Sequence, residues 1–90
     1  MNKSDLVRAI AAETNVKQRD CEAMLKAFTD NVMKAVSDGE KVSLVGFGSF
    51  GVVSRKARAG RNPATGQKIK IPAKKIPKFT AGKEFRDLVD

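Results

Sequence analysis

The chain has 90 residues, with 18 Lys or Arg against 10 Asp or Glu, a formal net charge of +8, and 41% hydrophobic residues. A single Cys and no His exclude an intrachain disulfide and a Cys/His zinc site. No apolar run approaches the roughly 20 residues of a membrane span or resembles a secretory signal, so we expect a cytoplasmic protein. A domain this small has a marginal core, which favours oligomerisation.

The first predicted helix begins at Asn2 and continues to about Glu13. Asn2 precedes Asp5 by three residues, the spacing of an N-cap followed by an acidic first turn. The apolar positions that follow recur with helical periodicity.

A second, longer helix is predicted from about Gln18 to Asp38, with Gly39 as its C-terminal stop. Asn15 is favoured over Lys17 as its N-cap, because a lysine is unfavourable beside the positive end of a helix. Cys21 falls on the apolar stripe, so we interpret it as a packed core thiol. The opposite face alternates in sign at every fourth position, which predicts a solvated, self-paired surface: Glu22, Lys26, Asp30, Lys34 and Asp38.

After Gly39 the apolar period changes to two, which predicts strands around residues 42–44 and 50–53. The segment Gly46-Phe47-Gly48 lies between them and is interpreted as a turn, since it lacks the remaining residues of a phosphate-binding loop. Apolar neighbours favour core positions for Phe47, Phe50 and Phe79 over stacking on bases.

Residues 55–75 are too polar for a core and predict a protruding two-stranded arm. Pro63 occupies the second position of a predicted type I turn at its tip. Pro72 cannot donate to a strand ladder and is expected on an edge or where the arm meets the body. After Gly82 a short final helix is predicted, with an apolar face of Phe85, Leu88 and Val89.

Charge is segregated along the chain. Residues 41–83 contain eleven Lys or Arg and no Asp or Glu, whereas the remainder contains seven basic and ten acidic residues. Clustered cations bind nucleic-acid phosphates through counterion release, while a merely solubilising surface mixes both signs. This indicates a nucleic-acid partner, with acidic membrane or protein surfaces as the alternatives.

Catalysis is not expected, because the chain lacks His, Tyr and Trp and its basic half lacks carboxylates for a metal-dependent nuclease. The arm favours a mechanical role instead. Pro63 is a rigid apolar ring beside Arg61 and Asn62, and partial insertion between base steps would kink DNA at a cost of a few kcal/mol. Arg55, Arg58 and Arg61 would then follow the minor groove, giving shape-selective binding with little sequence preference.

Three groups of residues together resemble the family of the bacterial histone-like protein HU and integration host factor over essentially the whole chain. They are Val45-Gly46-Phe47-Gly48-Ser49-Phe50, then Gly60-Arg61-Asn62-Pro63 with Thr65-Gly66, then Pro77, Phe79 and Gly82-Lys83. This family is itself an established example of minor-groove architectural binding, so the wedge interpretation is not independent of the resemblance.

The resemblance implies an α+β fold and an intertwined homodimer. Two N-terminal helices per chain form a helical base, beside a three-stranded antiparallel sheet with an extended β-ribbon arm and a short C-terminal helix. The expected division of the single domain 1–90 is a helical dimerisation region at 1–40, sheet at 41–54 and 76–81, the arm at 55–75 and the final helix at 82–90. The expected dimer core is Phe28, Val32, Leu44, Phe47, Phe50 and Phe79.

The resemblance also implies a set of DNA-binding positions. Pro63 would be the intercalating wedge, and the expected contacts are Lys3, Gly46, Gly48, Arg55, Arg58, Arg61, Asn62, Pro63, Lys74, Lys75 and Lys83. No catalytic residue, metal or cofactor is expected.

The function predicted is a non-enzymatic, nucleoid-associated protein of the cytoplasm that bends, wraps and compacts double-stranded DNA, with a preference for bent, nicked or gapped DNA. A site-preferring subunit like those of integration host factor is the first alternative. An RNA-binding module and a scaffold for an acidic protein are the others, and no membrane association is expected.

Overall fold

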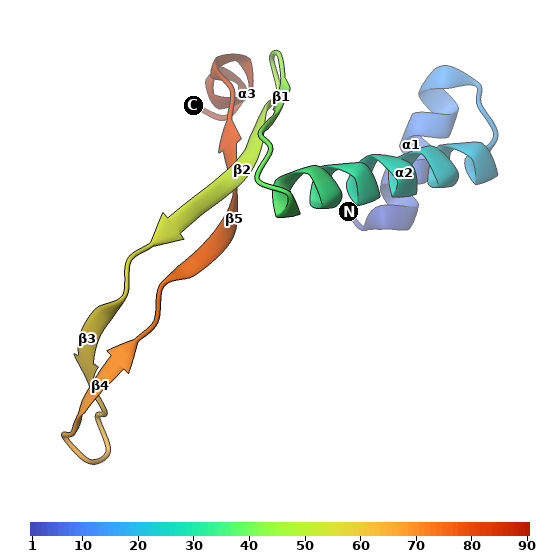
Figure 1. Cartoon of the computed structure of the whole chain (residues 1–90). Coiled ribbons are helices and arrows are strands. Elements are labelled where there is room, and N and C mark those ends of the chain that lie inside the picture. Colours follow the sequence, from blue (N-terminus) through green and yellow to red (C-terminus); the bar gives the residue numbers. More distant parts are fainter. The chain divides into compact units, whose positions relative to one another are not determined.

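The structure is a computed structural model that describes the backbone of residues 1–90 and all side chains except those of Arg58 and Ile71. The elements follow in the order α1 (Lys3–Thr14), α2 (Gln18–Ser37), β1 (Val42–Leu44), β2 (Gly48–Arg55), β3 (Arg58–Arg61), β4 (Lys68–Ile71), β5 (Lys74–Ala81) and α3 (Lys83–Val89) (Figure 1). They form two compact units, residues 1–34 and 35–90. The boundary between the units lies within α2, and the functional division at residue 40 stays a prediction.

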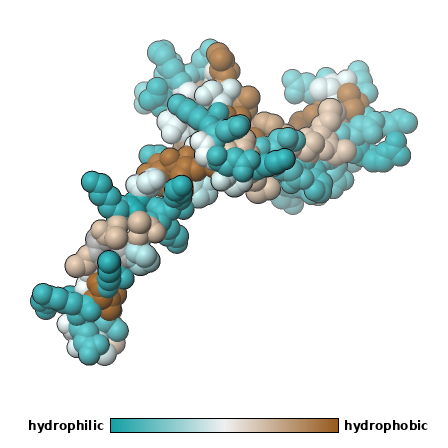
Figure 2. Space-filling view, viewed as in Figure 1, coloured by the Kyte–Doolittle hydropathy of each residue, from teal (hydrophilic) through white to brown (hydrophobic). Residues whose placement is uncertain are grey.

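Much of the visible surface is hydrophilic, with apolar patches exposed among the polar side chains (Figure 2). In the part of the chain whose side chains are described, the buried apolar residues are Val7, Cys21 and Val36. No helix among the described residues has the length and apolar content needed to cross a membrane.

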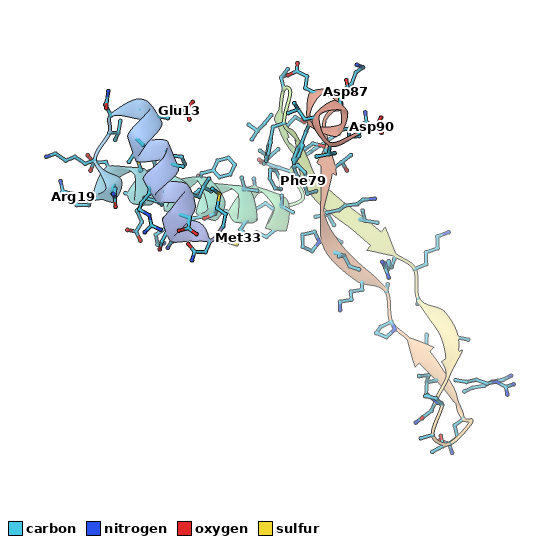
Figure 3. The ribbon with its side chains drawn as sticks, turned by 180° about the vertical axis from the view of Figure 1, so that it is seen from behind. Glu13, Arg19, Met33, Phe79, Asp87 and Asp90 are labelled. Carbon is cyan, nitrogen blue, oxygen red and sulfur yellow. The ribbon has the colours of Figure 1, made fainter. Side chains whose placement is uncertain are left out.

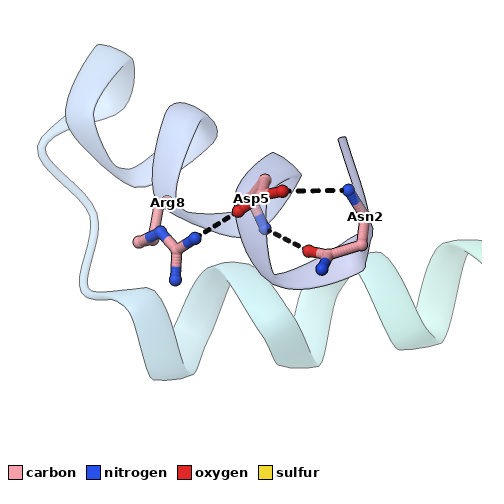
Figure 4. Close-up of polar contacts among 3 residues, drawn as sticks. All are labelled: Asn2, Asp5 and Arg8. Atoms are coloured by element: carbon pink, nitrogen blue, oxygen red, sulfur yellow. Dashed lines mark hydrogen bonds and ion pairs between the residues drawn. The ribbon is translucent and has the colours of Figure 1, made fainter.

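The start of α1 is fixed by a reciprocal pair of hydrogen bonds. The Asp5 amide donates to Asn2 Oδ1 at 2.9 Å, and the Asn2 amide donates to Asp5 Oδ2 at 3.1 Å. Arg8 also pairs with the Asp5 carboxylate (Figure 4). This capping box satisfies amides that a helix end otherwise leaves free, and it confirms the predicted N-cap.

The connection between the first two helices corrects the prediction for Asn15. Asn15 is the C-cap of α1, with a left-handed φ of 58° and its amide donating to the Ala11 carbonyl at 2.9 Å. The Lys17 carbonyl accepts the Cys21 amide at 3.0 Å, so Lys17 occupies the N-cap position of α2. Asparagine tolerates the left-handed conformation, which makes it suitable for ending a helix. Glu13 and Arg19 flank this connection in Figure 3.

At its other end α2 stops as predicted. Gly39 has a φ of 87°. Its amide donates to the Val36 carbonyl at 3.0 Å, and the Glu40 amide donates to the Ala35 carbonyl at 2.9 Å. These two bonds form a Schellman motif, which satisfies carbonyls at the end of the helix.

Cys21 is buried, with its thiol 3.7 Å from the Val16 carbonyl, so the predicted core position is confirmed. Other residues on the apolar stripe of the same helix are not covered: Met24 and Phe28 remain 55% and 40% exposed. The first unit therefore leaves apolar surface open.

The second unit contains a three-stranded antiparallel sheet with the order β1-β2-β5 and a separate two-stranded ribbon of β3 and β4. Strand β2 already begins at Gly48, where it pairs with Leu44 on one side and Ala81 on the other. β1 is only three residues long, so β2 and β5 continue beyond it as a pair as far as Arg55 and Lys74. The next two residues on each side leave the ladder, and pairing resumes at Arg58 and Ile71.

An aromatic cluster packs one end of the sheet against α3. The Phe47 and Phe85 rings are stacked with centroids 5.6 Å apart, and the Phe50 and Phe79 rings are 4.9 Å apart. Phe79 lies beside α3 in Figure 3. The three predicted core rings therefore pack on one another, but Phe47 and Phe79 keep 43% and 37% of their surface exposed, and a core position for them stays a prediction.

Candidate nucleic-acid interface

The β3–β4 ribbon ends in a turn built around Asn62. The Asn62 carbonyl accepts the Gly66 amide at 2.7 Å, and the Asn62 amide donates to the Gln67 carbonyl at 2.8 Å. The closing bond therefore joins residues i and i+4, not the i and i+3 of the predicted type I turn. Pro63 keeps the position directly after the first turn residue and is exposed.

The register gives the described part of this ribbon two different faces. Arg61 pairs with Lys68 and Ala59 pairs with Lys70, and residues two apart in a strand share a face. Three cations therefore lie on one face. Gly60 and Ile69 pair on the other face. The side chain of Arg58 lies outside the described residues.

The three-stranded sheet also has two faces. One carries Phe50 and Phe79, which pair directly, and it belongs to the aromatic core. The other carries a row of hydroxyl groups, because Ser49 pairs with Ser43 on β1 and with Thr80 on β5. This second surface is called the hydroxyl face below.

Cations lie on the side of the hydroxyl row that leads toward the arm. Lys78 pairs with Gly51 two residues along from the Ser49–Thr80 pair, so it lies on the hydroxyl face. A Cβ added to Gly51 would come within 4.0 Å of Lys41 Cγ, which places the Lys41 side chain at the same position across the sheet. Farther along, the Arg55–Lys74 pair shares this face.

The strand register places Lys74 and Lys75, both predicted DNA contacts, on opposite faces of the sheet. Lys74 pairs with Arg55 and Lys75 pairs with Ser54, and successive strand residues point to opposite faces. Lys75 thus lies on the face of Val52 and Pro77, away from Lys74. Contact of both lysines with DNA stays a prediction, but one flat surface does not present both.

The predicted body lysines are paired with carboxylates. Lys3 Nζ is 3.6 Å from Glu22 Oε1, and Lys83 Nζ donates to Asp87 Oδ2 at 2.8 Å. Both pairs are well exposed, so each is weak and water can replace the partner. A phosphate would have to compete with these carboxylates for Lys3 and Lys83.

The two glycines of the predicted site differ. Gly46 has a φ of 85° in the turn after β1, and the Glu84 carboxylate approaches it so closely that a Cβ would lie 2.8 Å from Oε2. Gly48 is buried against Phe79 and the Thr80 carbonyl. The structure gives Gly48 a packing role, and its contact with DNA stays a prediction.

Sequence reasoning missed four lysines of these cationic faces: Lys41, Lys68, Lys70 and Lys78. Period-two alternation along residues 67–71 indicated a strand, but it did not tell which residues pair across the ribbon.

Among the described side chains, no cluster of three or more His, Cys, Asp or Glu is arranged to hold a metal ion.

Comparison with known proteins identifies the family. The family described as "Bacterial DNA-binding protein" matches residues 1–90. An HU protein of Nostoc sp. (strain PCC 7120) is 51% identical over 89 residues, which cover 99% of this chain and 95% of that protein. The chain belongs to the HU family of bacterial DNA-binding proteins. HU of Clostridium pasteurianum is 48% identical over 90 residues, covering 100% of this chain and 99% of that protein.

Solved HU structures share the fold. An Anabaena HU–DNA cocrystal structure matches with a TM-score of 0.91 and 50% identity, covering 99% of this chain and 97% of that one. HU from Thermotoga maritima matches with a TM-score of 0.72 and 30% identity over 100% of both chains. The predicted α+β fold, the family resemblance and the non-enzymatic, DNA-binding character are confirmed.

Proposed function

We propose that this HU-family chain acts as a homodimer that bends and compacts double-stranded DNA of the nucleoid in the cytoplasm. The arm grips the minor groove, Pro63 acts as a wedge, and the hydroxyl face of the sheet supports the curved duplex. The observation that carries the proposal is a ribbon whose cations have no carboxylate within residues 41–83 and whose exposed tip presents a proline.

The distribution of charge supports the proposal that the ribbon binds DNA phosphates. The ion pairs among the described side chains join Lys or Arg to carboxylates within residues 1–34 or within α3. The ribbon cations whose side chains are described, Arg61, Lys68 and Lys70, are in none of these ion pairs, so they repel one another until an anion neutralises them. Each phosphate that they bind releases condensed counterions, which favours association at low salt.

The two faces of the β3–β4 ribbon fit a groove. Arg61, Lys68 and Lys70 would reach the phosphates along the groove edge, while Gly60 and Ile69 would lie on the opposite face. The minor groove displays little sequence information, so contacts of this kind favour shape and deformability over sequence.

The wedge follows from the position of Pro63. Inserting an apolar ring between base steps costs a few kcal/mol of stacking, and the kink brings more phosphates to the protein. A nick or gap lowers that cost because the stack is already interrupted. Preference for distorted DNA is therefore an expected property of the proposed wedge.

Exposed apolar surface supports the dimer. Four of the six predicted dimer-core residues, Phe28, Leu44, Phe47 and Phe79, are 36% to 43% exposed in the single chain, and Val32 and Phe50 are only partly buried. Monomeric proteins rarely leave this much of their large apolar side chains uncovered. A second copy would cover them and supply the core that 90 residues lack.

Binding and bending of a nicked duplex, compared with the intact duplex, test the proposal. We expect tighter binding to the nicked DNA and a salt-dependent affinity. Pro63→Ala should reduce the bend angle more than the affinity, because it removes the wedge and leaves the cations. Equal affinity for both duplexes together with a flat salt dependence would refute the proposal.

A matched pair of arginine variants locates the interface. Arg61→Ala should weaken binding and reduce the salt slope by about 1, whereas Arg19→Ala, on exposed α2 surface beside Asp20, should change neither. Competition with single-stranded and A-form RNA separates the RNA-binding alternative, since an RNA reader would prefer those polymers. Preference for particular duplex sequences would favour the alternative of a site-selective subunit.

A further inference from the structure

The tip of the arm is held by one side chain in addition to its backbone bonds. Asn62 Oδ1 accepts the Ala64 amide at 2.9 Å, across the Pro63 peptide units. Asn62 itself is half-buried, whereas Pro63 and Ala64 are exposed. The side chain of Asn62 thus folds over the turn instead of extending outward as a free polar group.

We infer that Asn62 is a positioning residue for the Pro63 wedge, acting through this Oδ1 bond and not through direct contact with DNA. The inference rests on the proposed function of Pro63. It revises the predicted role of Asn62, which the sequence placed together with Pro63 among the DNA-contacting residues of the tip.

The backbone of the turn is restrained at Asn62, Pro63 and Gly66. The proline ring fixes φ of Pro63, and the proline also restricts Asn62 to extended conformations. Gly66 takes a φ of 72° and closes the turn on the Asn62 carbonyl. The proline ring leaves rotation about the bond between Cα and the carbonyl carbon of Pro63 free. The Oδ1 bond to the Ala64 amide restrains that rotation.

This restraint matters because the wedge has to enter a base step in one orientation. An unrestrained tip would spread Pro63 over several directions, and only a fraction of these would be competent for insertion. Among protein molecules held on DNA by the ribbon cations, the fraction with an inserted wedge, and with it the mean bend angle, falls as that competent fraction falls. The phosphate-binding cations of the ribbon do not depend on it.

The substitutions at position 62 separate the two roles. Asn62→Ala removes Oδ1 and keeps the restriction that the following proline imposes. Asn62→Asp keeps an acceptor oxygen, removes the amide nitrogen that a direct contact with an acceptor on DNA would require, and adds a negative charge, so the neutral acceptor variant Asn62→Ser is compared with it. Thr65→Ala is the control, because the Thr65 hydroxyl accepts only a long bond of 3.4 Å from the Gln67 amide of the same turn.

Two measurements on the full-length protein test the inference. The first is the solvent-exchange rate of the Ala64 amide in the free protein, followed by NMR. It should rise about three- to tenfold in Asn62→Ala, the range expected from losing one modest hydrogen bond, and should be little changed in Asn62→Asp and Thr65→Ala. The second is the bend angle of nicked DNA at saturating protein, where differences in affinity no longer matter. It should fall in Asn62→Ala and be kept in Asn62→Asp.

The outcomes are distinct. Unchanged Ala64 exchange and an unchanged bend angle in Asn62→Ala would overturn the inference. Loss of bending in Asn62→Ala, Asn62→Asp and the neutral Asn62→Ser, with the Ala64 amide still protected in the last two, would assign the amide nitrogen to DNA and overturn the inference as well. If the unsubstituted protein does not bend DNA, the proposed function fails, while the exchange measurement still reports whether Asn62 holds the tip.

Discussion

Gly48 is the position where the fold has the least room for a side chain. A Cβ there would lie 2.5 Å from the Thr80 carbonyl oxygen and 2.6 Å from Phe79 Cζ, and the first of these is backbone that cannot rotate away. Gly48→Ala should destabilise the protein by about 3 kcal/mol, from overpacking together with an unfavourable φ. Urea unfolding measures this directly.

Gly39→Ala is the matched control. Gly39 also has a positive φ, of 87°, but nothing lies within 4 Å of the added Cβ. Gly39→Ala should therefore lower the stability of the fold only through its unfavourable backbone conformation, by about 1 kcal/mol. Equal losses in the two variants would mean that packing at Gly48 contributes nothing.

A second prediction at the residue scale concerns the Lys26–Asp30 pair on α2. Lys26 Nζ donates to Asp30 Oδ2 at 2.7 Å. This hydrogen bond, and secondly the attraction of the opposite charges, raises the pKa of Lys26 above the ordinary 10.5. Since the folded-state pKa is raised, the stabilisation is fully present below about pH 10.5 and is lost as pH rises through the folded-state value.

Titration of Lys26 by NMR checks this shift. Asp30→Asn should return the pKa of Lys26 toward 10.5 and leave stability near pH 7 little changed, because the pair is exposed. An unshifted Lys26 in the unsubstituted protein would contradict the prediction.

At the residue scale, helix ends could be predicted from the sequence where they depend on nearby residues alone. The Asn2–Asp5 capping box and the Gly39 stop could be predicted because each depends on neighbours within three to five positions. Asn15 could not be assigned correctly, since the same side chain suits either the end of one helix or the start of the next. Only the left-handed backbone at this position decides between them.

At the scale of elements, the sheet has a DNA-facing candidate that follows from strand register. Lys78 on β5 shares the hydroxyl face with Ser49 and Thr80, opposite the aromatic core. Lys78→Ala should lower DNA affinity and reduce the magnitude of the salt slope by about 0.9, the value for one lost phosphate contact. Fluorescence anisotropy at several salt concentrations measures both quantities.

Lys26→Ala provides the comparison for Lys78. It removes the same charge from a lysine on exposed α2 surface whose partner is Asp30. Its salt slope should match that of the unsubstituted protein. If the two variants weaken binding equally, net charge and not the hydroxyl face determines the effect.

The strands were predictable in type and only partly in detail. Alternating apolar residues at 42–44 and 50–53 indicated the sheet, but β2 begins earlier, at Gly48, because the turn before it needs only residues 45–47. Strand pairing is interrupted at residues 56–57 and 72–73, and Pro72 was the one residue from which the sequence could predict this. The faces of Lys74, Lys75 and Lys78 required the register, which pairs these lysines with residues far away in the sequence.

For the whole molecule, the decisive prediction is the oligomeric state, which we expect to be a dimer of two identical chains. The unsubstituted protein should sediment at about twice the 9.8 kDa chain mass, and its thermal midpoint should rise with concentration. Phe28→Lys should shift the protein toward monomer and lower its stability by about 2 to 4 kcal/mol, because it would place a charge in the proposed interface.

Ala23→Lys tests whether a new lysine on α2 is harmful by itself. Ala23 is exposed and lies close to the charged face of the helix, so this variant should remain dimeric and stable. A monomeric unsubstituted protein, or equal dissociation of both variants, would contradict the predicted role of Phe28. The composition pointed to oligomerisation but could not show which surface is shared, since that depends on which apolar residues the single chain leaves open.

The strand edges beyond β1 have a consequence for solubility inside a crowded cell. An exposed strand edge can recruit other chains into growing aggregates. Pro77 lies on the edge strand β5, and Pro72 lies in the unpaired segment between β4 and β5, so neither residue offers a backbone N–H to an incoming strand. Lysines at 68, 70, 74, 75 and 78 add mutual repulsion between copies. The prolines and lysines of the proposed DNA-binding arm should thus also protect it from amyloid-like stacking.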